Sequence, residues 1–177
     1  IDLWSDILAA LGRPQSIAEI GAGAGQNLRA IARLCPNAEM VAIEPNAGSR
    51  QHIVTSGIVP AEDVHDGTAS DIPLDDGEVE MAFTSGVLIH IPPDQLLKAC
   101  REIHRVAART IVCIEYFSAA PRALEYRGHS GKLWVRDYGS FWLDNFPDLV
   151  PLGCGFAWKR ATGLDDLTWF AFQKGDG

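Results

Sequence analysis

The sequence lacks paired cysteines, clustered metal ligands and long apolar runs. Its four cysteines, Cys35, Cys100, Cys113 and Cys154, lie far apart with no C-x-x-C pair, which indicates buried thiols in a reducing compartment. No apolar run is long enough to span a bilayer, and the first residues have neither the basic region nor the apolar core of a signal peptide. These absences predict a cytoplasmic protein that uses no metal and does not enter a membrane.

Basic residues are also few and scattered, with 15 Lys and Arg against 23 Asp and Glu and a net charge of −8. Nucleic-acid binding relies on clustered Lys and Arg, so RNA and DNA are disfavoured as partners. The length of 177 residues and the hydrophobic content of 47% suit one core. We therefore expect residues 1–177 to form a single domain, without room for a second one.

A glycine-rich stretch near the start organises the rest of the sequence. An apolar run over 17–20 breaks into alternating glycines and resumes as a helix-periodic segment over 26–34, a pattern that indicates strand, tight loop and helix. Glycines let the backbone approach a ligand closely, and the first amides of the following helix point toward that ligand. The stretch is typical of an α/β domain that binds an adenosine-type cofactor.

The glycine spacing separates two classes of cofactor. A dinucleotide loop needs a glycine three residues after the second one, for close packing of helix on strand, and Gln26 occupies that position. The pattern is instead Glu19-x-Gly21-x-Gly23-x-Gly25, which resembles the first motif of class I S-adenosylmethionine-dependent methyltransferases. In that family the acidic residue helps to orient the methionine end of the cofactor, and the resemblance implies this role for Glu19.

A second acidic residue supports this interpretation. Glu44 ends the strand-like run 40–43, about twenty residues beyond the loop, where a carboxylate can accept hydrogen bonds from both ribose hydroxyls. The alternative is a glycine-rich turn with a solvated carboxylate. Related methyltransferases carry an acid–Ala pair beside the adenine, and here Thr68 stands where that acid is usual, followed by Ala69. The residues expected to bind S-adenosyl-L-methionine are Glu19, Gly21, Ala22, Gly23, Gly25, Asn27, Glu44, Pro45, Thr68, Ala69, Ser85 and Gly86.

Strand-like and helix-like segments alternate along most of the chain. A helix over 2–11, capped by Asp2, comes first and either packs on the sheet or covers the cofactor. Further strands are predicted over 39–44, 62–66, 80–86, 109–116, 149–158 and 167–173, and the last two are expected to be joined tightly. The alternation predicts an α/β fold with a doubly wound, seven-stranded, mostly parallel sheet that binds ligands at the carboxyl ends of its strands. The resemblance implies a Rossmann-like methyltransferase fold, in which the last strand is antiparallel.

The C-terminal third carries a more specific resemblance. The stretches Glu115-Tyr116-Phe117, 126–129, 132–137 and 165–170, together with 87–91, resemble the methylase family associated with pseudaminic acid biosynthesis. The resemblance covers nearly the whole chain and implies a nonulosonic sugar acid, or its precursor, as acceptor. Where that family has Glu-Tyr-Tyr-Asn-Pro, this sequence has Phe117-Ser118-Ala119 after the Glu-Tyr pair, so the role of that asparagine does not transfer.

Polar residues within 115–177 are the candidates for the acceptor site. Glu115 and Tyr116 end the fifth strand at the ligand-binding edge, and His129 lies in a polar stretch without periodicity, over 118–136. These three are the predicted catalytic residues. His90 follows the fourth strand and is a possible base, but its apolar neighbours favour a packed histidine whose ring nitrogens are satisfied.

Positive charge is concentrated locally in this acidic sequence. Arg127 and Arg136 lie on either side of Lys132, and the planar guanidinium matches a carboxylate or phosphate. We therefore expect Arg127 or Arg136 to bind the acid group of the acceptor. The alternatives are a solvated loop, or an internal ion pair of Arg136 with Asp137 or Asp144.

Two aspartates begin the last predicted strand at the same edge of the sheet. Asp165 and Asp166 can hold an amine or hydroxyl of the acceptor, or they can close the turn, which is a common role of aspartate. Trp158 and Trp169 are expected in the core rather than as platforms for a sugar ring.

Together these features predict a methyltransferase for a small polar, anionic acceptor. The sulfonium already makes the methyl group a good electrophile, so the protein has to align the acceptor and, for a hydroxyl, remove a proton. The sequence leaves oxygen and nitrogen open as the methylated atom, and the missing metal-ligand spacing disfavours catechol-type chemistry. Alternatives are a methyltransferase of another small metabolite, an NAD-dependent reductase, which Gln26 disfavours, and a scaffold that binds the cofactor without turnover.

Overall fold

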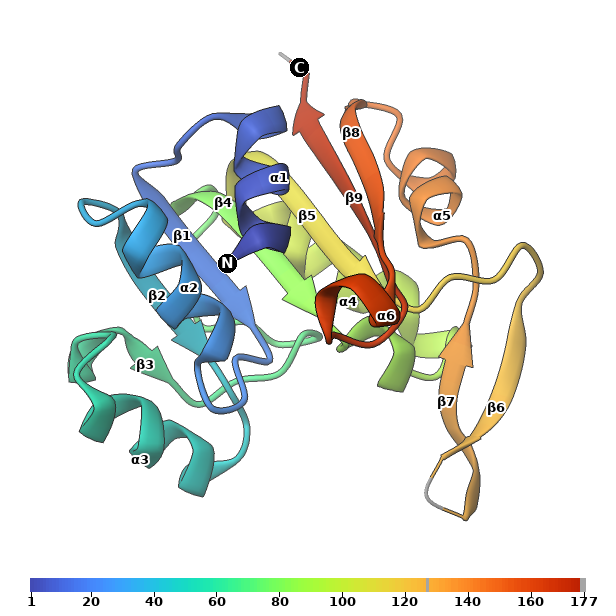
Figure 1. Ribbon diagram of the computed structural model, residues 1–177, viewed down its shortest axis with the longest axis horizontal. Coiled ribbons are helices and arrows are strands. Elements are labelled where there is room, and N and C mark those ends of the chain that lie inside the picture. Colours follow the sequence, from blue (N-terminus) through green and yellow to red (C-terminus); the bar gives the residue numbers. More distant parts are fainter. Residues whose placement is uncertain (127, 176–177) are drawn as a thin grey trace.

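The computed structural model describes residues 1–126 and 128–175, with the backbone alone for Tyr126, His129 and Ser130. Seven strands form one sheet in the order β3-β2-β1-β4-β5-β9-β8 (Figure 1). Their bounds are β1 Ser16–Ile20, β2 Glu39–Ile43, β3 Val64–His65, β4 Val79–Ser85, β5 Ala107–Glu115, β8 Leu149–Ala157 and β9 Leu167–Lys174. β1 to β5 pair in parallel, and β9 is antiparallel to both β5 and β8. The predicted doubly wound, mostly parallel sheet with an antiparallel last strand is thereby confirmed.

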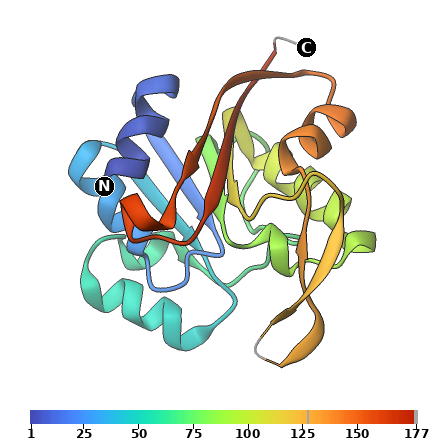
Figure 2. The ribbon, with the colours of Figure 1, turned by 45° about the vertical axis from the view of Figure 1, so that its right-hand side comes forward.

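Helices cover both faces of this sheet, as Figure 2 shows. On one face α1 (Asp2–Leu11), α2 (Gln26–Leu34) and α3 (Ala47–Ser56) bury apolar side chains against the sheet. On the other face α4 (Pro93–Val106) and α5 (Tyr138–Asn145) do the same. The short turns η1 (Ala61–Asp63) and η2 (Leu88–His90) and the short helix α6 (Lys159–Thr162) complete the elements.

Polar side chains and glycines fix where several helices begin and end. Asn46 accepts a hydrogen bond from the Ser49 amide at the start of α3, and Asp137 accepts one from the Ser140 amide at the start of α5, as is usual for N-cap residues. The expected cap of α1 is wrong by one residue: Ile1 occupies the cap position, and Asp2 lies in the first turn. There its negative charge still complements the helix dipole.

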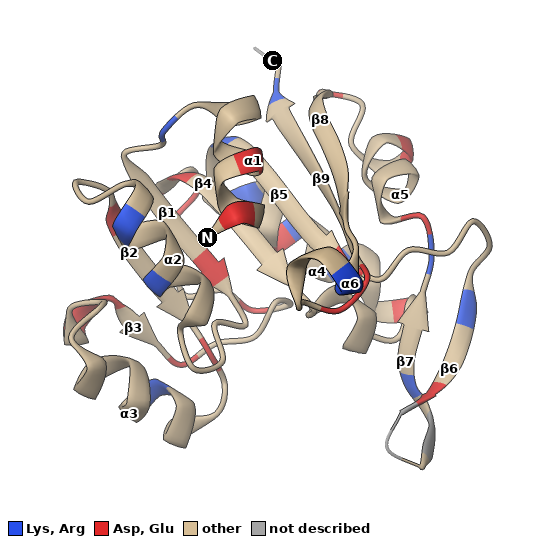
Figure 3. Cartoon of the chain, viewed as in Figure 1, with Lys and Arg blue, Asp and Glu red and all other residues tan. Residues whose placement is uncertain are grey.

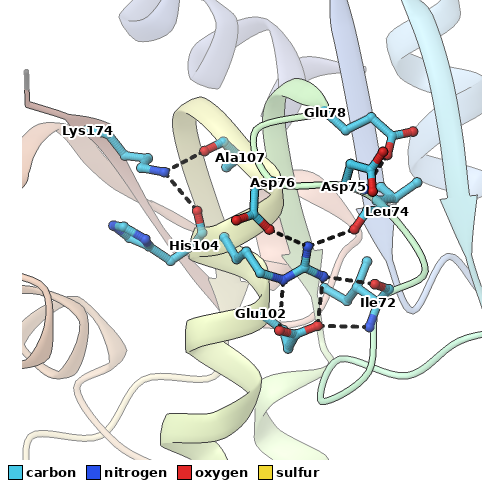
Figure 4. A network of polar contacts seen from close by, with 10 residues as sticks. Ile72, Leu74, Asp75, Asp76, Glu78, Glu102, His104, Ala107 and Lys174 are labelled. Carbon is cyan, nitrogen blue, oxygen red and sulfur yellow. Dashed lines mark hydrogen bonds and ion pairs between the residues drawn. The ribbon is translucent and has the colours of Figure 1, made fainter.

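Arg105 of α4 forms hydrogen bonds that hold the connection between β3 and β4 against that helix (Figure 4). Its guanidinium donates to the carbonyl oxygens of Leu74 at 2.7 Å and Ile72 at 3.0 Å, and to the Asp76 carboxylate at 2.9 Å. Glu102, one turn earlier, accepts two further bonds from Arg105 and one from the Ile72 amide. The connection that follows the predicted adenine-binding residues is therefore held in a defined position.

The stretch 118–136 forms a hairpin, which the sequence did not predict. β6 (Arg122–Tyr126) and β7 (His129–Val135) pair antiparallel as a separate two-stranded sheet, which lies beside η2 (Figure 1). Leu133 and Val135 are buried, whereas most of β6 is exposed. Because only a few alternate positions face the core, the apolar periodicity of the hairpin is weak.

The connection between the last two strands is longer than expected. α6 and a glycine turn lie between β8 and β9, and Trp158 at the end of β8 is 53% exposed. Its predicted place in the core is thus wrong, while Trp169 is buried as expected. β3 is also shorter than the predicted 62–66 because it pairs only at the sheet edge, with β2. Among the described residues, no helix is long and apolar enough to cross a membrane.

Candidate functional site

The carboxyl ends of β1, β2 and β4 gather most of the predicted cofactor residues around two cavities. The first has a volume of about 460 Å³, and its lining includes Gly21, Glu44, Pro45, Thr68, Ala69 and Gly86. The second, of about 340 Å³, is lined by Glu19, Gly21, Ala22, Gly23, Asn27 and Ser85, among others. Gly21 lies in both linings, so the cavities adjoin at the glycine loop. Gly25 lines neither, and with φ of +72° it turns the loop into α2.

Glu19 is buried at the end of the second cavity. Its side chain is 2% exposed, and Oε1 accepts a hydrogen bond from Nδ2 of Asn27 at 2.7 Å. Oε2 is buried and has no hydrogen-bond partner in the part of the chain that the structure describes. Burial raises the pKa of Glu19 to about 8, because the low-dielectric interior disfavours the charged form. The site therefore suits a cationic partner that restores the charge of the carboxylate.

α1 both packs on the sheet and reaches this site. Trp4 is buried against Phe83, with ring centroids 4.6 Å apart, and donates from Nε1 to Oδ1 of Asn27 at 3.1 Å. Leu3 lines the second cavity. The first turn of this helix thus supports Asn27 and also borders the second cavity, and its role in covering the cofactor stays a prediction.

Glu44 connects the glycine loop to the start of α3. Its Oε2 accepts from the Gly23 amide and its Oε1 from the Asn46 amide, both at 2.8 Å. Each carboxylate oxygen has a further lone pair, so the side chain can also accept from a ligand in the first cavity. The sequence pointed to the ribose contact alone and did not indicate this structural role.

Gly21 allows the loop to approach the segment after β4. Its φ is +77°, and a Cβ atom at this position would lie 2.6 Å from Cγ2 of Val87. Gly23 also has a positive φ, of +53°, but a Cβ there would meet no protein atom within 4 Å. Backbone conformation favours glycine at both positions, and close contact excludes a side chain at Gly21 alone.

Thr68 and Ala69 form part of the first cavity through a tight turn. Thr68 and Asp71 exchange two backbone hydrogen bonds of 3.1 Å. The turn is followed directly by the connection that Arg105 fastens to α4. The turn contributes Thr68, Ala69 and Ser70 to the lining of the cavity, and their contact with the adenine stays a prediction.

Glu115 does not face an open cavity. Its carboxylate is 1% exposed and accepts from Oγ1 of Thr84 at 2.9 Å and from the amides of Val87, Leu88 and Ile89 at 3.1 to 3.4 Å. Burial raises its pKa to about 7 although all four donors favour the charged form. In this arrangement the carboxylate contacts protein groups only, which is a correction to the direct catalytic role expected from its strand-end position.

Tyr116 joins a polar cluster formed by segments far apart in the sequence. Its hydroxyl donates to Oδ2 of Asp165 at 2.9 Å, and Nζ of Lys159 lies 3.0 Å from Oδ1 of the same carboxylate. The Lys159 side chain holds the pKa of Asp165 below its usual value. Asp166 accepts from the Lys159 amide at 2.8 Å and so closes the turn into α6. With Arg122 these four residues line a third cavity, of about 260 Å³.

The remaining predicted residues have different positions. The guanidinium carbon of Arg136 lies 5.1 Å from the ring centroid of Phe141, and its buried Nε has no hydrogen-bond partner among the described residues. The cavities described here do not include Arg136 in their linings. Of its two expected alternative partners, Asp137 caps α5 instead, and the described residues show no ion pair of Arg136 with Asp144. Arg127 lies outside the described residues, as does the side chain of His129.

His90 is satisfied but not packed in the core. It is exposed and lines the first cavity, and its Nδ1 lies 2.9 Å from the carbonyl oxygen of Lys132 in β7. The packed histidine that the sequence favoured is therefore wrong in its burial. The apolar neighbours Leu88 and Ile89 fill the core instead, because the η2 turn directs His90 away from them.

Sequence reasoning missed Arg122, Lys159 and the pair Leu164 and Leu167, which borders the second cavity. They lie on the unpredicted hairpin, on the connection between β8 and β9, and at the first residue of β9. Figure 3 shows that Lys and Arg are spread over many elements, with acidic residues between them. A single cation in such a distribution gives no signal in the sequence. The described residues contain no group of three or more side chains placed to hold a metal ion.

The family match decides what kind of protein carries this site. Residues 17–110 match the methyltransferase domain family, which covers the glycine loop, Glu44 and the η2 turn. The chain belongs to this family. Together with the strand order, the match makes the chain a class I S-adenosylmethionine-dependent methyltransferase with S-adenosylmethionine as cofactor, as the sequence predicted.

Solved structures of methyltransferases share the fold at low identity. The 1,6-didemethyltoxoflavin-N1-methyltransferase of Burkholderia thailandensis, with bound 1,6-didemethyltoxoflavin and S-adenosylhomocysteine, has a TM-score of 0.76 at 15% identity, over 99% of this chain and 82% of its own. A methyltransferase from Methanosarcina mazei has a TM-score of 0.75 at 14% identity over the full length of both chains. One from Aquifex aeolicus has a TM-score of 0.69 at 15% identity, over 96% and 88%. No protein of curated function matches the chain.

Proposed function

We propose that this methyltransferase binds the adenosine part of its cofactor in the 460 Å³ cavity and the methionine part in the 340 Å³ cavity. The observation that supports this most is Oε2 of Glu19, which is buried without a partner beside the second cavity. A buried polar atom of this kind is costly unless a ligand satisfies it. The ammonium group of the methionine part has the complementary charge. Gly21, common to both cavities, leaves room where the two parts of the cofactor meet.

S-adenosylmethionine, when bound, supplies a methyl group on a positively charged sulfur. The protein then has to hold the cofactor, align the acceptor and exclude water. Glu19 and Asn27 bind the methionine end, Glu44 orients the ribose, and the 68–70 turn contacts the adenine. Leu164 and Leu167 border the second cavity with apolar side chains, which limits the access of water to that end of the site.

For the acceptor site we propose the 260 Å³ cavity and its surroundings, formed within residues 115–177 of a single domain. Tyr116, Arg122, Lys159, Asp165 and Asp166 line it. Two cations and two carboxylates suit a small acceptor that carries an acid group together with hydroxyl or amine groups. A nonulosonic sugar acid of the pseudaminic type, or its precursor, has this chemistry, and another small acidic metabolite is the alternative.

Proton removal depends on the methylated atom. A hydroxyl acceptor requires a base, for which His129 remains the sequence-based prediction, whereas an amine loses its proton to a weak base or to water. Tyr116 donates its hydroxyl hydrogen to Asp165, so we assign it the role of orienting the acceptor. Arg122 replaces Arg136 as the candidate for the acid group, because Arg136 packs on Phe141.

Methyl transfer to an extract of small metabolites tests this function. The protein is incubated with the extract and a cofactor labelled in its methyl group, and labelled products are identified by mass spectrometry. The proposal predicts a labelled small molecule with an acid group. A protein that binds S-adenosylhomocysteine but labels nothing in any extract would support the scaffold alternative instead.

A further inference from the structure

The segment between β4 and α4 forms one wall of the 460 Å³ cavity. Gly86, Val87 and His90 line the cavity from this segment, residues 86–90, which we call the wall segment. Gly86 donates from its amide to the carbonyl oxygen of Ile114 at 2.8 Å. The wall segment contains the η2 turn, whose first amides have no partner within the turn itself.

A single carboxylate binds these amides from inside the protein. Glu115 accepts from the successive amides of Val87, Leu88 and Ile89, at 3.2, 3.1 and 3.4 Å. Thr84, the residue before Ser85 at the end of β4, donates its hydroxyl hydrogen to the same side chain. A backbone amide can only donate, so all three of these bonds require an acceptor and favour the charged carboxylate over the neutral acid.

We propose that Glu115 is a positioning residue, whose buried negative charge holds the wall segment in the shape that binds the adenosine part of the cofactor. The proposal rests on the proposed cofactor site. It gives Glu115 a function without contact to the reacting atoms, since Val87 and His90 reach the cavity and Glu115 does not. Val87 also lies directly against Gly21, so a displaced wall would disturb the glycine loop as well.

Few other groups near Glu115 can change charge in the same pH range. Cys100 of α4, Cys113 of β5 and Tyr138 of α5 each interact with its charge, and burial raises the pKa of all three above their ordinary values. They therefore stay neutral near neutral pH. Arg136 acts on Cys100 and Tyr138 and keeps its positive charge. Among these groups, Glu115 is thus the one expected to titrate as the pH falls from about 8 to about 6.

The test compares the wild type with Glu115→Gln, using 5′-methylthioadenosine as the probe. This compound keeps the adenine, ribose and sulfur but lacks the amino-acid part that Glu19 is proposed to bind. For the wild type we expect affinity to fall about tenfold between about pH 8 and about pH 6, as expected for loss of a charge-assisted hydrogen bond. Glu115→Gln should bind about tenfold more weakly at pH 8 and lack this component of the pH dependence. All other side chains are the same in both proteins, so the difference between the two pH profiles reports on residue 115.

Hydrogen exchange of the free protein provides a readout that needs no ligand. At pH 8 the amides of 87–89 should exchange about tenfold faster in Glu115→Gln than in the wild type. The matched control is Glu80→Gln, which removes the charge of a glutamate that also accepts a backbone hydrogen bond, from Gln15, at the other end of β4. This control should leave both the exchange of the wall segment and the affinity for the probe unchanged.

A second variant tests the proposal even if Glu115→Gln does not fold. Thr84→Val keeps the shape and the carboxylate but removes one hydrogen bond that favours the charge. It should therefore move the midpoint of the wild-type pH profile to higher pH. The proposed role of Glu115 would be overturned if Glu115→Gln had the affinity for the probe and the amide exchange of the wild type, and if Thr84→Val had the same midpoint in its pH profile as the wild type. Absence of probe binding to every protein would contradict the cofactor site, and this proposal with it.

Discussion

At the scale of single residues, the buried carboxylate of Glu19 lowers the stability of the folded protein and, in the proposed site, strengthens the binding of the cofactor. Its pKa of about 8 in the folded protein lies above the ordinary value of 4.5. Between these values the folded state holds a proton that the unfolded state has lost, so stability falls as the pH rises through this range. A bound cationic ligand favours the charged carboxylate, so it lowers the pKa of Glu19 and reduces this loss of stability.

Replacing Glu19 by Gln separates these two effects. In chemical denaturation without ligand, the wild type should lose stability between about pH 5 and about pH 8, whereas Glu19→Gln should lose a few kcal/mol less over that range, on the order of 1.4 kcal/mol for each pH unit. Calorimetry should show affinity for S-adenosylhomocysteine reduced by about 1.5 to 3 kcal/mol. A variant with unchanged affinity and the wild-type pH slope would contradict both the buried charge and its role in binding.

Two glycines of the loop differ in a testable way. Gly21→Ala and Gly23→Ala both introduce a side chain at positive φ, but only the first creates a contact of 2.6 Å, with Val87. We expect Gly21→Ala to lower the free energy of unfolding by about 1 to 3 kcal/mol more than Gly23→Ala, as for overpacked cores. Adding Val87→Ala to Gly21→Ala should recover most of that difference in urea denaturation. Equal losses for both alanine variants would show that backbone strain alone determines the preference for glycine.

At the scale of elements, the parallel strands could be predicted and the hairpin could not. β1, β4 and β5 are short apolar runs because helices cover both of their faces, and such runs are plain in a sequence. β6 and β7 bury only a few side chains, among them Leu133 and Val135. Their pairing depends on contacts with η2, including the bond between His90 and Lys132, which no local pattern indicates.

The candidate site also has one part that the sequence could predict and one part that it could not. The proposed cofactor side follows from the order of strands and loops, so the spacing in the sequence indicated Glu19, Gly21 and Glu44, which line the two cavities at the glycine loop. Its acceptor side depends on segments that meet only in the folded protein, such as Tyr116 with Asp165, which are 49 positions apart. The sequence predicted that Arg127 or Arg136 binds the acid group of the acceptor. The cations that line the cavity are instead Arg122 and Lys159.

The position of Arg122 in the hairpin leads to a prediction about the charge of the acceptor. Arg122→Gln should raise the Michaelis constant for an anionic acceptor about tenfold, as for loss of a charged hydrogen bond, and leave that of its neutral analogue unchanged. Arg160→Gln is the matched control, because this exposed arginine of α6 is not part of the cavity lining. The same loss for both acceptors would point to a structural role of Arg122 and remove support for an acidic substrate.

At the scale of the whole molecule, the strand order brings most of the proposed binding residues to one edge of the sheet. The carboxyl ends of β1, β2, β4, β5 and β8 and the start of β9 all lie there, because β9 alone is reversed in the sheet. The two cavities at the glycine loop lie at these ends, and the third, beside Tyr116, lies between them and the β6–β7 hairpin, which contributes Arg122, Leu124 and Val135. One domain can therefore bring the proposed cofactor and acceptor sites to the same edge of the sheet.

Calorimetric titration with S-adenosylhomocysteine, with NAD as the comparison ligand, tests this account most directly. We expect one molecule of S-adenosylhomocysteine to bind per chain, with protons released on binding near pH 7, because Glu19 becomes charged as it meets the ammonium group. NAD should not bind, since the loop lacks the third dinucleotide glycine. Binding of NAD in preference to S-adenosylhomocysteine, or absence of binding by a folded protein, would contradict the account.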